Sequence, residues 1–581
     1  MTVEKLITDH IDIWSSALQT RSTAGRGSNG KIDLYGIKKL RELILELAVR
    51  GKLVPQDPND EPASELLKRI ASEKAELVKQ GKIKKQKWMS EISEDDKPFE
   101  LPVGWEWVRM DHVGHDWGQK TPENDFTYID VGSINKELGI VAEPTIIQAQ
   151  DAPSRARKIV RRNTVVYSTV RPYLLNIAVI NEDFQPEPIA STAFAIVHPW
   201  EGISATFIYH YLRSPVFINY VESCQTGVAY PAINDKQFFA GVVAIPPLEE
   251  QLRIVDKVND LMSLCDQLEQ QSLTSLDAHQ QLVETLLTTL TDSQNSEELA
   301  ENWARISLHF ETLFTTEASI DALKQTILQL AVMGKLVPQD PNDEPASELL
   351  KRIEQEKAQL VKEGKIKKQK PLPPISDDEK SFELPQGWEW CRIIEIAQVG
   401  TGATPSRDTP DYWQHPEFNW VTSGETSLPF IFNTVEKISL KAVKETNVSI
   451  YPPGTLIIAM YGQGKTRGQI TELCISAGTN QACASIQLFD TNEYHRRYVK
   501  LFFEKSYEDL RSLASGGAQP NLNLAKVSNT LIPIPPFSEQ IKIVTKVEEL
   551  FKVCDTLKSR LQSSQQTQLH LADALTDAAL N

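Results

Sequence analysis

Two short stretches hold residue types that could bind a phosphate or a metal ion. "AMYGQGKT" (Ala459–Thr466) follows the apolar run "TLIIAM" and ends in Gly-Lys-Thr. A phosphate-binding loop needs glycine where this chain has Ala459, and no second acidic strand motif is evident, so an NTP-dependent enzyme is the weaker interpretation. The alternative is a polar and basic turn at a strand end, suited to phosphate and base-edge contacts. Its members would be Tyr461, Gly462, Gln463, Lys465 and Arg467.

The second stretch places His112 and His115 three residues apart beside Asp111. With no third ligand nearby, we expect two exposed loop histidines rather than a metal site. We find no Ser-His-Asp triad, no paired carboxylates and no Asn-Pro-Pro-aromatic tetrapeptide of a methyltransferase. The sequence therefore predicts no catalytic residue, no metal and no cofactor in this chain, which would do no chemistry alone.

Basic residues cluster in "SRARKIVRRNTVVYSTVRPY", which contains no acid and interleaves Tyr167 and Tyr173 with its cations. These cations are Arg155, Arg157, Lys158, Arg161, Arg162 and Arg171. The stretch is either a solvated loop and strand edge or a surface that reads a nucleic-acid groove. "TGATPSRDTPDYW" (Thr401–Trp413) and the Tyr461–Arg467 turn are its equivalents later in the chain.

The overall composition limits the class of protein. The net charge of -17 argues against nucleic acid, although a basic stripe can lie on an acidic body. No apolar run approaches the roughly 20 residues that cross a bilayer, and "MTVEKLITDHIDIW" is not a signal peptide. Six scattered cysteines without a C-x-x-C pair indicate neither a zinc site nor disulfides. We expect a cytoplasmic protein with no membrane contact.

An internal repeat organises the chain. "GKLVPQDPNDEPASELLKRI" (Gly51–Ile70) returns letter for letter as Gly334–Ile353, and "FELPVGWEW" returns as "FELPQGWEW". "IPPLEEQLRIVDKV" (Ile245–Val258) pairs with "IPPFSEQIKIVTKV" (Ile534–Val547). Residues 108–225 and 391–515, which lie between these blocks, share no evident similarity. The pattern predicts a duplicated frame with two variable inserts, and an identical block of this length suggests that one partner binds the same surface twice.

The frame is predicted to be helical. Leu40, Ile44 and Leu47 match Leu323, Ile327 and Leu330 on one helix face, with Gly51 and Gly334 at the C-cap. Ser64 and Ser347 precede a second helix that ends at Gly81 or Gly364. A long helix over Leu252–Leu290, about 58 Å, would place Val255, Val258, Met262, Cys265, Leu268, Leu276, Leu282 and Leu286 on one side. This helix is either a buried helix of a large domain or one helix of a coiled coil, which the polar residues at its other positions favour. In the coiled coil it would pair with its repeat, the helix that carries Val544, Val547, Phe551, Cys554 and Leu557.

The inserts have the composition of small α+β domains. β-Branched and aromatic runs bounded by Gly, Pro and Asn predict short strands. These runs are Thr164–Ile180, Ser191–Pro199, Gly454–Gly462 and Asn480–Phe489.

Taken together, the motifs resemble the specificity subunit of a Type I restriction-modification enzyme. Each variable insert opens near "LPxGWEW" and closes with "TGVAYPAIN" or "GGAQPNLN", then "IPP" and "EQ" and a long helix. The resemblance implies an α+β fold with two target recognition domains joined by long paired helices, an antiparallel coiled-coil spacer and a pseudo-two-fold internal repeat. It implies an N-terminal helix and flexible segment (1–36), a first frame (37–97), recognition domain 1 (98–247), a central helical region (248–380), recognition domain 2 (381–536) and a C-terminal helix (537–581). Residues 1–36, with "STAGRGSNGK" (Ser22–Lys31), either echo the helix near Trp303–Phe314 or tether the N-terminus to the frame.

The resemblance also implies partners. Each domain would read one half of a split sequence in double-stranded DNA, with two methylation subunits that bind S-adenosylmethionine and two ATP-driven motor-nuclease subunits. Methylation would fall on adenine N6. The candidate DNA-binding residues are Lys120, Arg155, Arg157, Arg161, Arg162, Arg171, Tyr173, Tyr230, Thr404, Ser406, Arg407, Tyr461, Gln463, Lys465, Arg467, Gln519 and Asn521. A coiled-coil assembly protein whose variable domains bind other proteins remains the alternative.

Overall fold

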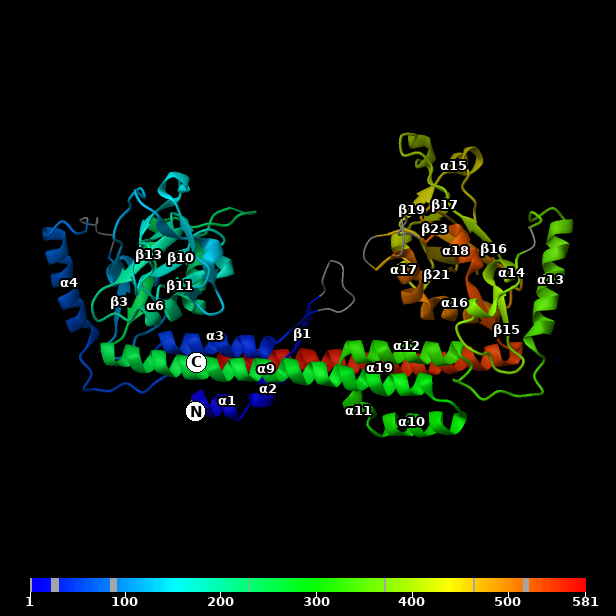
Figure 1. The fold of residues 1–581 in the computed structure, drawn as a ribbon, viewed down its shortest axis with the longest axis horizontal. Coiled ribbons are helices and arrows are strands. Elements are labelled where there is room, and N and C mark those ends of the chain that lie inside the picture. The colour runs from blue at the N-terminus through cyan, green and yellow to red at the C-terminus, as the bar shows by residue number, and fades with distance from the viewer. Residues whose placement is uncertain are drawn as a thin grey trace. The chain divides into compact units, whose positions relative to one another are not determined.

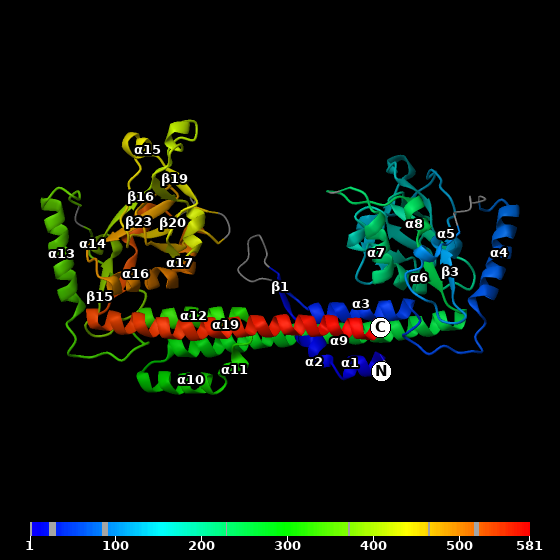
Figure 2. The same cartoon turned by 180° about the vertical axis from the view of Figure 1, so that it is seen from behind.

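The computed structural model describes residues 3–21, 31–83, 91–227, 229–369, 372–462, 465–515 and 522–580 (Figures 1 and 2). The chain forms two compact units. Unit 1 comprises Met1–Gln19, Asp33–Thr274 and Gln565–Asn581, and unit 2 comprises Thr20–Ile32 and Ser275–Ser564. In each unit an α+β domain lies on one side of a layer of frame helices (Figure 1). No helix in the described ranges combines the length and apolar character that spanning a membrane requires.

The first frame helix of each unit ends as predicted. α3 (Tyr35–Val49) is followed by Gly51 at φ +68°, and α12 (Glu317–Val332) by Gly334 at φ +70°. A Cβ at Gly51 would lie 2.4 Å from Pro102 Cγ, and one at Gly334 2.6 Å from Pro385 Cγ. Glycine is required here both for the left-handed backbone and for the close approach of the "LP" segment.

The second frame helix of each unit faces mainly solvent. α4 (Ala63–Lys79) and α13 (Ala346–Lys362) begin one residue before the predicted serines and are preceded by Pro62 and Pro345. Both helices end just before Gly81 or Gly364, which adopt positive φ. The buried residues of these helices form one narrow stripe: Ala63, Leu66 and Ile70 in α4, and Ala346, Leu349 and Ile353 in α13.

Two long helices complete the frames. α9 (Leu248–Asp292) has 45 residues, six more than predicted, and α19 (Phe537–Leu580) has 44. The start of α9 and the end of α19 belong to unit 1, whereas the end of α9 and the start of α19 belong to unit 2. The two helices therefore run antiparallel, as predicted. In unit 2 their buried residues share one core with α12.

The predicted apolar face of α9 is correct in its first half and wrong near its end. Val258, Cys265 and Leu268 are buried. Leu282 is 50 % exposed, and the core is formed instead by Val283, Leu287 and Leu290. Near the end of α9 the predicted apolar face is shifted by one residue, because apolar residues there occupy two adjacent faces of the helix.

Lysines of the repeated block cap the ends of both long helices. Lys52 Nζ donates to the backbone oxygen of Leu580 at the end of α19. Lys335 Nζ donates to the backbone oxygens of Thr291 and Ser293 at the end of α9, at 2.6 and 2.9 Å. A cation at this position satisfies carbonyls that the helix leaves unpaired and interacts favourably with the helix dipole.

The two α+β domains share a common strand order although their sequences do not resemble one another; β9 occurs only in unit 1 and β18 only in unit 2. The first sheet is β11-β10-β13-β4 in unit 1 and β16-β23-β20-β21-β18 in unit 2. The second sheet is β8-β5-β12-β9 in unit 1 and β19-β17-β22 in unit 2, with β5–β12 and β17–β22 parallel. In unit 1 these two sheets consist of β4 (Gly114–His115), β5 (Phe126–Ile129), β8 (Thr145–Ile147), β9 (Ala156–Ile159), β10 (Val165–Ser168), β11 (Ile177–Val179), β12 (Pro188–Ser191) and β13 (Phe194–Pro199), beside a small ribbon of β6 (Ile134–Asn135) and β7 (Ile140–Val141). Those of unit 2 are β16 (Ala397–Thr401), β17 (Phe418–Val421), β18 (Phe430–Ile431), β19 (Glu436–Ile438), β20 (Leu456–Ala459), β21 (Ile470–Leu473), β22 (Ala477–Thr479) and β23 (Cys483–Leu488).

Matching helices follow the sheets in each unit. They are α6 (Ala205–Leu212), α7 (Pro215–Cys224) and α8 (Asp235–Ala240) in unit 1, and α16 (Glu493–Lys505), α17 (Tyr507–Ser515) and α18 (Leu524–Asn529) in unit 2. At the other end of the chain, α1 (Val3–Thr8) and α2 (Ile11–Ser16) precede α3 as α10 (Ser296–Leu308) and α11 (Phe310–Leu313) precede α12. Trp14 of α2 is fully buried, and Gly36 of α3 lies against its backbone. Apart from Lys31, the segment Ser22–Lys31 lies outside the described residues.

A buried carboxylate attaches each domain to its long helix. A two-stranded ribbon closes each domain: β3 (Glu106–Arg109) with β14 (Val242–Ile245), and β15 (Glu389–Arg392) with β24 (Leu531–Ile534). Just before β3, Trp105 Nε1 donates to Glu250 Oε2 in the first turn of α9, at 2.9 Å; Trp388 and Glu539 repeat this bond at 2.9 Å. Each carboxylate is 1 % exposed. Burial raises the pKa of Glu250 and Glu539, while the indole N–H opposes the shift.

The neighbouring glutamine of "EQ" holds the domain from a second direction. Gln251 Oε1 accepts from the backbone N–H of Ser204, the N-cap of α6, at 2.9 Å. In unit 2, Gln540 Oε1 lies 3.0 Å from His495 Nδ1 of α16. The "GWEW" and "IPPxxEQ" motifs are therefore the two sides of one junction.

We predict that Trp105→Phe lowers the free energy of unfolding by about 1.5–3 kcal/mol, because it leaves a buried carboxylate oxygen without its donor. Urea denaturation followed by circular dichroism measures the change. Val103→Ala is the control, since Val103 is 97 % exposed and surface changes of this kind cost less than about 0.5 kcal/mol. Equal midpoints for both variants would show that the buried bond does not stabilise the junction.

Candidate nucleic-acid interface

In unit 2, three loops and one turn meet at a single edge of the two sheets, which we call rim 2. The turn joins β22 to β23 and spans residues 480–482, and the loops follow β16, β17 and β20. Ala403 N donates to Thr479 O at 2.9 Å, Asn480 N to Val421 O at 3.1 Å, and Met460 N to Ala482 O at 2.7 Å. The loops are thus bonded to one common turn and hold a fixed arrangement.

A close backbone approach explains the glycine in "TGATP". A Cβ on Gly402 would lie 1.9 Å from Thr479 O, far inside van der Waals contact. Only glycine lets the loop after β16 lie directly on the 480–482 turn. This brings Thr404 to the tip of the turn, where its hydroxyl hydrogen-bonds to Gln481 Oε1.

Unit 1 has a corresponding edge, rim 1. Its turn, Thr192–Ala193, joins β12 to β13. Thr169 N, one residue after β10, donates to Ala193 O at 2.9 Å, as Met460 N, one residue after β20, donates to Ala482 O. Thr192 N donates to Arg155 O at 2.8 Å, which places the start of β9 beside this turn. The two rims therefore share one backbone plan, a bond from the residue after a central strand to the turn, while differing in turn length and in side chains.

Arg171 is the centre of rim 1. It lies in the turn between β10 and β11 at φ +50°, an uncommon backbone for a side-chain-bearing residue. Arg171 N donates to Pro231 O at 2.8 Å, which ties this turn to the loop before α8. The guanidinium carbon lies 4.7 Å from the ring centroid of Tyr230. Tyr230 and Tyr173 are 66 % and 53 % exposed, and Arg171 itself is half-buried.

The other predicted cations of unit 1 divide into two groups. Arg155, Arg157 and Lys120 lie at the start of β9 or beside it, with Lys120 N donating to Arg157 O at 2.9 Å. Two of these side chains have partners, because Arg157 bonds to Thr121 and Lys120 pairs with Glu187. Arg161 and Arg162 lie in the turn before β10, at the opposite end of that strand from Arg171.

Arg161 belongs to an aromatic cluster that the sequence did not reveal. Its guanidinium carbon lies 4.0 Å from the ring centroid of Trp117, and the ring of Trp117 contacts those of His115 and His198. Burial lowers the pKa of His198 to about 4, so this histidine is neutral at physiological pH. Among these side chains the positive charge is that of Arg161.

The predicted residues of unit 2 lie along rim 2 or in the loop that continues from it. Thr404 and Tyr461 flank the 480–482 turn, and Tyr461 is 39 % exposed. Lys465 is exposed in the turn between β20 and β21, where its backbone oxygen accepts from Tyr507 Oη at 2.6 Å. Ser406 and Arg407 follow Thr404. Arg467 lies between Lys465 and β21. Gln463, Gln519 and Asn521 lie outside the described residues.

Arg407 is held more firmly than its exposure suggests. Its guanidinium carbon lies 3.7 Å from the ring centroid of Trp413, and its Nη2 lies 2.5 Å from Glu436 Oε2. A guanidinium stacked on an indole keeps its plane fixed and still exposes part of its fork.

Several expectations from the sequence were wrong. His115 is 6 % exposed in a strand and His112 lies in a short helix, so neither is an exposed loop residue. Arg171 and Tyr173 occupy a turn, because the run Thr164–Ile180 folds as two antiparallel strands. Tyr167 is buried on β10, and the Nζ of Lys158 pairs with Asp235 Oδ2 at 2.8 Å while 5 % of the residue is exposed. These two residues belong to the core and not to a DNA-facing surface.

The phosphate-loop interpretation of "AMYGQGKT" also fails on backbone grounds. The segment connects β20 to the antiparallel strand β21, and Gly468 N donates to Ala459 O across the hairpin at 2.8 Å. A phosphate-binding loop leads into a helix whose N-terminal N–H groups face the anion. Here a strand follows, as the polar-turn interpretation requires. The described residues hold no group of three or more His, Cys, Asp or Glu placed to bind a metal ion.

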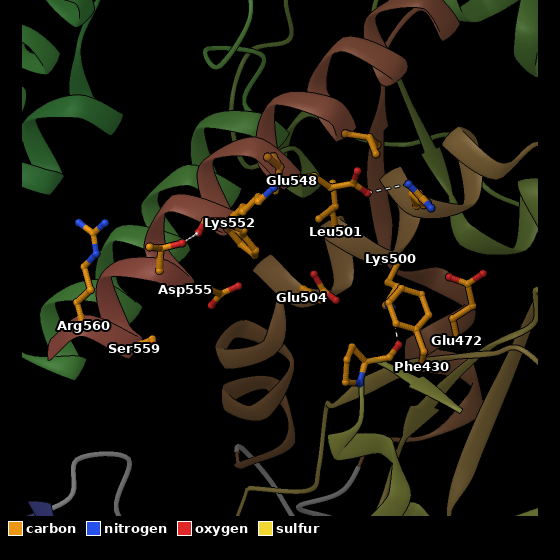
Figure 3. A pocket seen from close by; sticks show the side chains of 16 residues that line it. Phe430, Glu472, Lys500, Leu501, Glu504, Glu548, Lys552, Asp555, Ser559 and Arg560 are labelled. Atoms are coloured by element: carbon orange, nitrogen blue, oxygen red, sulfur yellow. Dashed lines mark hydrogen bonds and ion pairs between the residues drawn. The ribbon is translucent and has the colours of Figure 1, made fainter. Parts of the chain in front are cut away.

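A separate groove of about 690 Å³ lies between α16 and α19 (Figure 3). Two of its cations have partners in the groove: Arg497 pairs with Glu548 at 2.8 Å, and Lys500 Nζ donates to the backbone oxygen of Pro429 at 2.5 Å. Burial lowers the pKa of Lys500 and raises that of Glu504. None of the candidate DNA-binding residues of unit 2 lines the groove, so it is not part of the candidate interface.

Two domains with a common strand order, each carried on one copy of a duplicated helical frame, define a protein built from two related units. The chain belongs to the Type I restriction modification DNA specificity domain family, whose model matches residues 103–278 and 385–564. This confirms the resemblance that the motifs predicted. Over 614 residues it is 50 % identical to the Type I restriction enzyme EcoEI specificity subunit of Escherichia coli, covering 100 % of both chains.

A second relative and a solved structure agree with this family assignment. The Type I restriction enzyme EcoAI specificity subunit of Escherichia coli is 49 % identical over 613 residues, again covering 100 % of both chains. A solved structure titled as the structural basis of complex assembly and conformational transition of the type I R-M system aligns with a TM-score of 0.52 at 22 % identity. It covers 83 % of this chain and 99 % of that chain and supports the fold.

We predict that Gly402→Ala destabilises the protein by about 1–3 kcal/mol, because the added Cβ forces the loop away from the 480–482 turn. Thermal denaturation measures the loss. Gly424→Ala in the same domain is the matched control, since its Cβ would meet nothing closer than Thr422 Oγ1 at 3.9 Å. Two variants of equal stability would contradict the tight approach.

Proposed function

We propose that this chain is the non-catalytic DNA-specificity subunit of a Type I restriction-modification complex. Domains 98–247 and 381–536 would each read one half of a split target, while the frame segments 37–97, 248–380 and 537–581 hold them and bind partners. The observation that carries this proposal is the pair of rims, which share one backbone plan and differ in side chains. Such a pair suits two unlike half-sites read by one chain.

Rim 1 and rim 2 supply the groups that base reading needs. Arginine donates two parallel hydrogen bonds to guanine, and tyrosine stacks or bonds to phosphate. Arg171, Tyr173 and Tyr230 would provide these in the first domain, with Arg155, Arg157 and Lys120 beside them. Tyr461 and Lys465 would do so in the second, with Thr404 beside them. Arg161, Arg162, Ser406, Arg407 and Arg467 are proposed to contact the DNA backbone next to each half-site, and Gln463, Gln519 and Asn521 are proposed as further contacts.

A net charge of -17 does not oppose this role. Phosphate contacts act locally, within a Debye length of about 8–10 Å in physiological salt. The acidic side chains of the long helices do not belong to either rim. Partner subunits can also contribute positive charge next to the DNA.

We predict that Arg171→Ala and Lys465→Ala each alter a different half of the target. A lost base contact costs about 1–3 kcal/mol of discrimination at one position. The measurement is a genome-wide map of methylated adenine in cells that co-express the chain with its methylation subunit. The unmodified chain should give a split motif with two specified halves.

Arg305→Ala, an exposed charge in α10 outside both rims, serves as the control and should leave the motif unchanged. A motif without two halves, or one substitution that degrades both halves, would contradict the proposal. A coiled-coil assembly protein would give no new motif even with a folded, bound partner.

The duplicated block indicates how the partners attach. Nine of its twenty residues are exposed in both copies: Pro55, Gln56, Asp57, Pro58, Asn59, Glu61, Pro62, Lys68 and Arg69, repeated as Pro338, Gln339, Asp340, Pro341, Asn342, Glu344, Pro345, Lys351 and Arg352. Exposed positions usually tolerate substitution within about 0.5 kcal/mol, so the fold alone does not demand this identity. A ligand that meets both surfaces would demand it.

The side chains of the block also keep the same arrangement. Arg69 pairs with Glu61 at 2.6 Å and Arg352 with Glu344 at 2.8 Å, while Lys68–Glu65 and Lys351–Glu348 are both 2.7 Å. Such mixed charge suits a protein surface better than nucleic acid. We infer that two copies of the S-adenosylmethionine-binding methylation subunit dock here, and that two ATP-driven nuclease subunits join that complex to cleave DNA lacking N6-methyladenine.

We predict that Arg69→Glu or Arg352→Glu alone yields a complex with one methylation subunit, and that the double variant yields none. The charge reversal replaces the ion pair with Glu61 or Glu344 by a repulsion and changes the charge of the docking surface. Native mass spectrometry of the co-expressed complex counts the copies.

Ala71→Glu is the matched control, because the equivalent exposed position in α13 is already Glu354. Two copies bound to the double variant would show that the repeated block is not the docking surface.

A further inference from the structure

The turn that organises rim 2 carries an exposed amide at its tip. Gln481 lies between Thr404 on one side and Tyr461 on the other, where the two sheets of the domain meet. Its side chain is exposed, whereas Thr479 and Cys483 on either side of the turn are fully buried. Neither the variable sequence around Gln481 nor the motifs of the frame mark this residue.

The backbone under Gln481 is fixed. Asn480 Oδ1 accepts from Ala482 N at 3.1 Å, and Cys483 N donates to Asn480 O at 3.2 Å. Ala482 O accepts from Met460 N at 2.7 Å and from Tyr461 N at 3.3 Å. The loop that contains Gly402 packs directly against the backbone of the same turn. A residue on such a support loses little conformational freedom when it binds, which favours discrimination.

The side chain is also oriented. The hydroxyl of Thr404 donates to Gln481 Oε1, which fixes the side of the amide plane on which the oxygen lies. An amide oxygen has two lone pairs and the amide nitrogen two N–H donors. After this bond Gln481 therefore still offers one acceptor site beside its donors. That is the pattern with which glutamine binds adenine, accepting from N6–H and donating to N7 in the major groove.

We propose that Gln481 is a specificity-determining residue that reads an adenine in the half-site of the second domain, and that Thr404 is its positioning residue. The proposal rests on the proposed function of the two rims. The same turn in unit 1 exposes Thr192, whose single hydroxyl cannot form this pair of bonds. The corresponding position of the first half-site is therefore read differently, with one backbone plan serving two base preferences.

The test is the methylated-adenine map for Gln481→Ala, co-expressed with the methylation subunit. In the half that Lys465→Ala alters, one A·T position should lose about 10–100-fold of its discrimination. All positions of the other half should stay as in the unmodified chain. Gln398→Ala is the matched control, because Gln398 is an exposed glutamine at the opposite end of β16 from Thr404 and should change nothing.

Thr404 variants separate positioning from folding. Thr404→Val, which keeps the shape and removes the hydroxyl, should relax the same single position, and Thr404→Ser should restore it. A folding defect would instead lower methylation at every site. Relaxation at a G·C pair would overturn the adenine assignment, and an unchanged motif in Gln481→Ala would overturn the role of Gln481. If the unmodified chain gave no split motif, the proposed function itself would fail.

Discussion

The hydrogen bond from an indole N–H to a buried glutamate, Trp105 to Glu250 and Trp388 to Glu539, is the constraint on which the rest of each unit depends. Each glutamate lies in the first turn of a long helix, where the positive end of the helix dipole favours a carboxylate. A charge 1 % exposed must keep its donors, because an unpaired buried charge costs several kcal/mol. The tryptophan is therefore held against the helix, and with it the ribbon that closes the domain.

This junction explains why the inserts can diverge without loss of the fold. The glutamate and the tryptophan both lie outside the variable residues, so this bond does not depend on what the domain reads. The neighbouring glutamine instead bonds to a residue of the insert, Ser204 in unit 1 and His495 in unit 2. Inside the domains, the central strands β10 and β20 are both wholly buried, although their sequences, VVYS and LIIA, differ at every position. Many apolar sequences fill such a strand, whereas few fit the junction.

The frame could be predicted from the sequence in detail, and the rims only in part. Helix ends at Gly51 and Gly334 followed from local rules, because a left-handed residue at a helix end is determined by the neighbouring few residues. Leu282 was misplaced because two apolar stripes compete in the same helix, and only packing decides between them. The burial of His115 and the stacking of Arg161 on Trp117 depend on residues distant in sequence, which no local pattern contains. Gln481 was missed for the same reason, since its neighbours Thr404 and Tyr461 are brought to it by the meeting of two sheets.

Duplication gives one chain two kinds of surface, one that must stay the same in both copies and one that must differ between them. A surface that binds two copies of one partner must stay the same in both units, and the exposed residues of the block from Gly51 to Ile70 are unchanged in the second copy. A surface that reads a half-site gains from changing, and the turn at the centre of each rim exposes Thr192 in one unit and Gln481 in the other. Two lysines of the repeated block, Lys52 and Lys335, each cap the end of a long helix that begins in the opposite unit. Each frame is therefore completed by a helix from the other half of the chain, so neither half has a complete frame of its own.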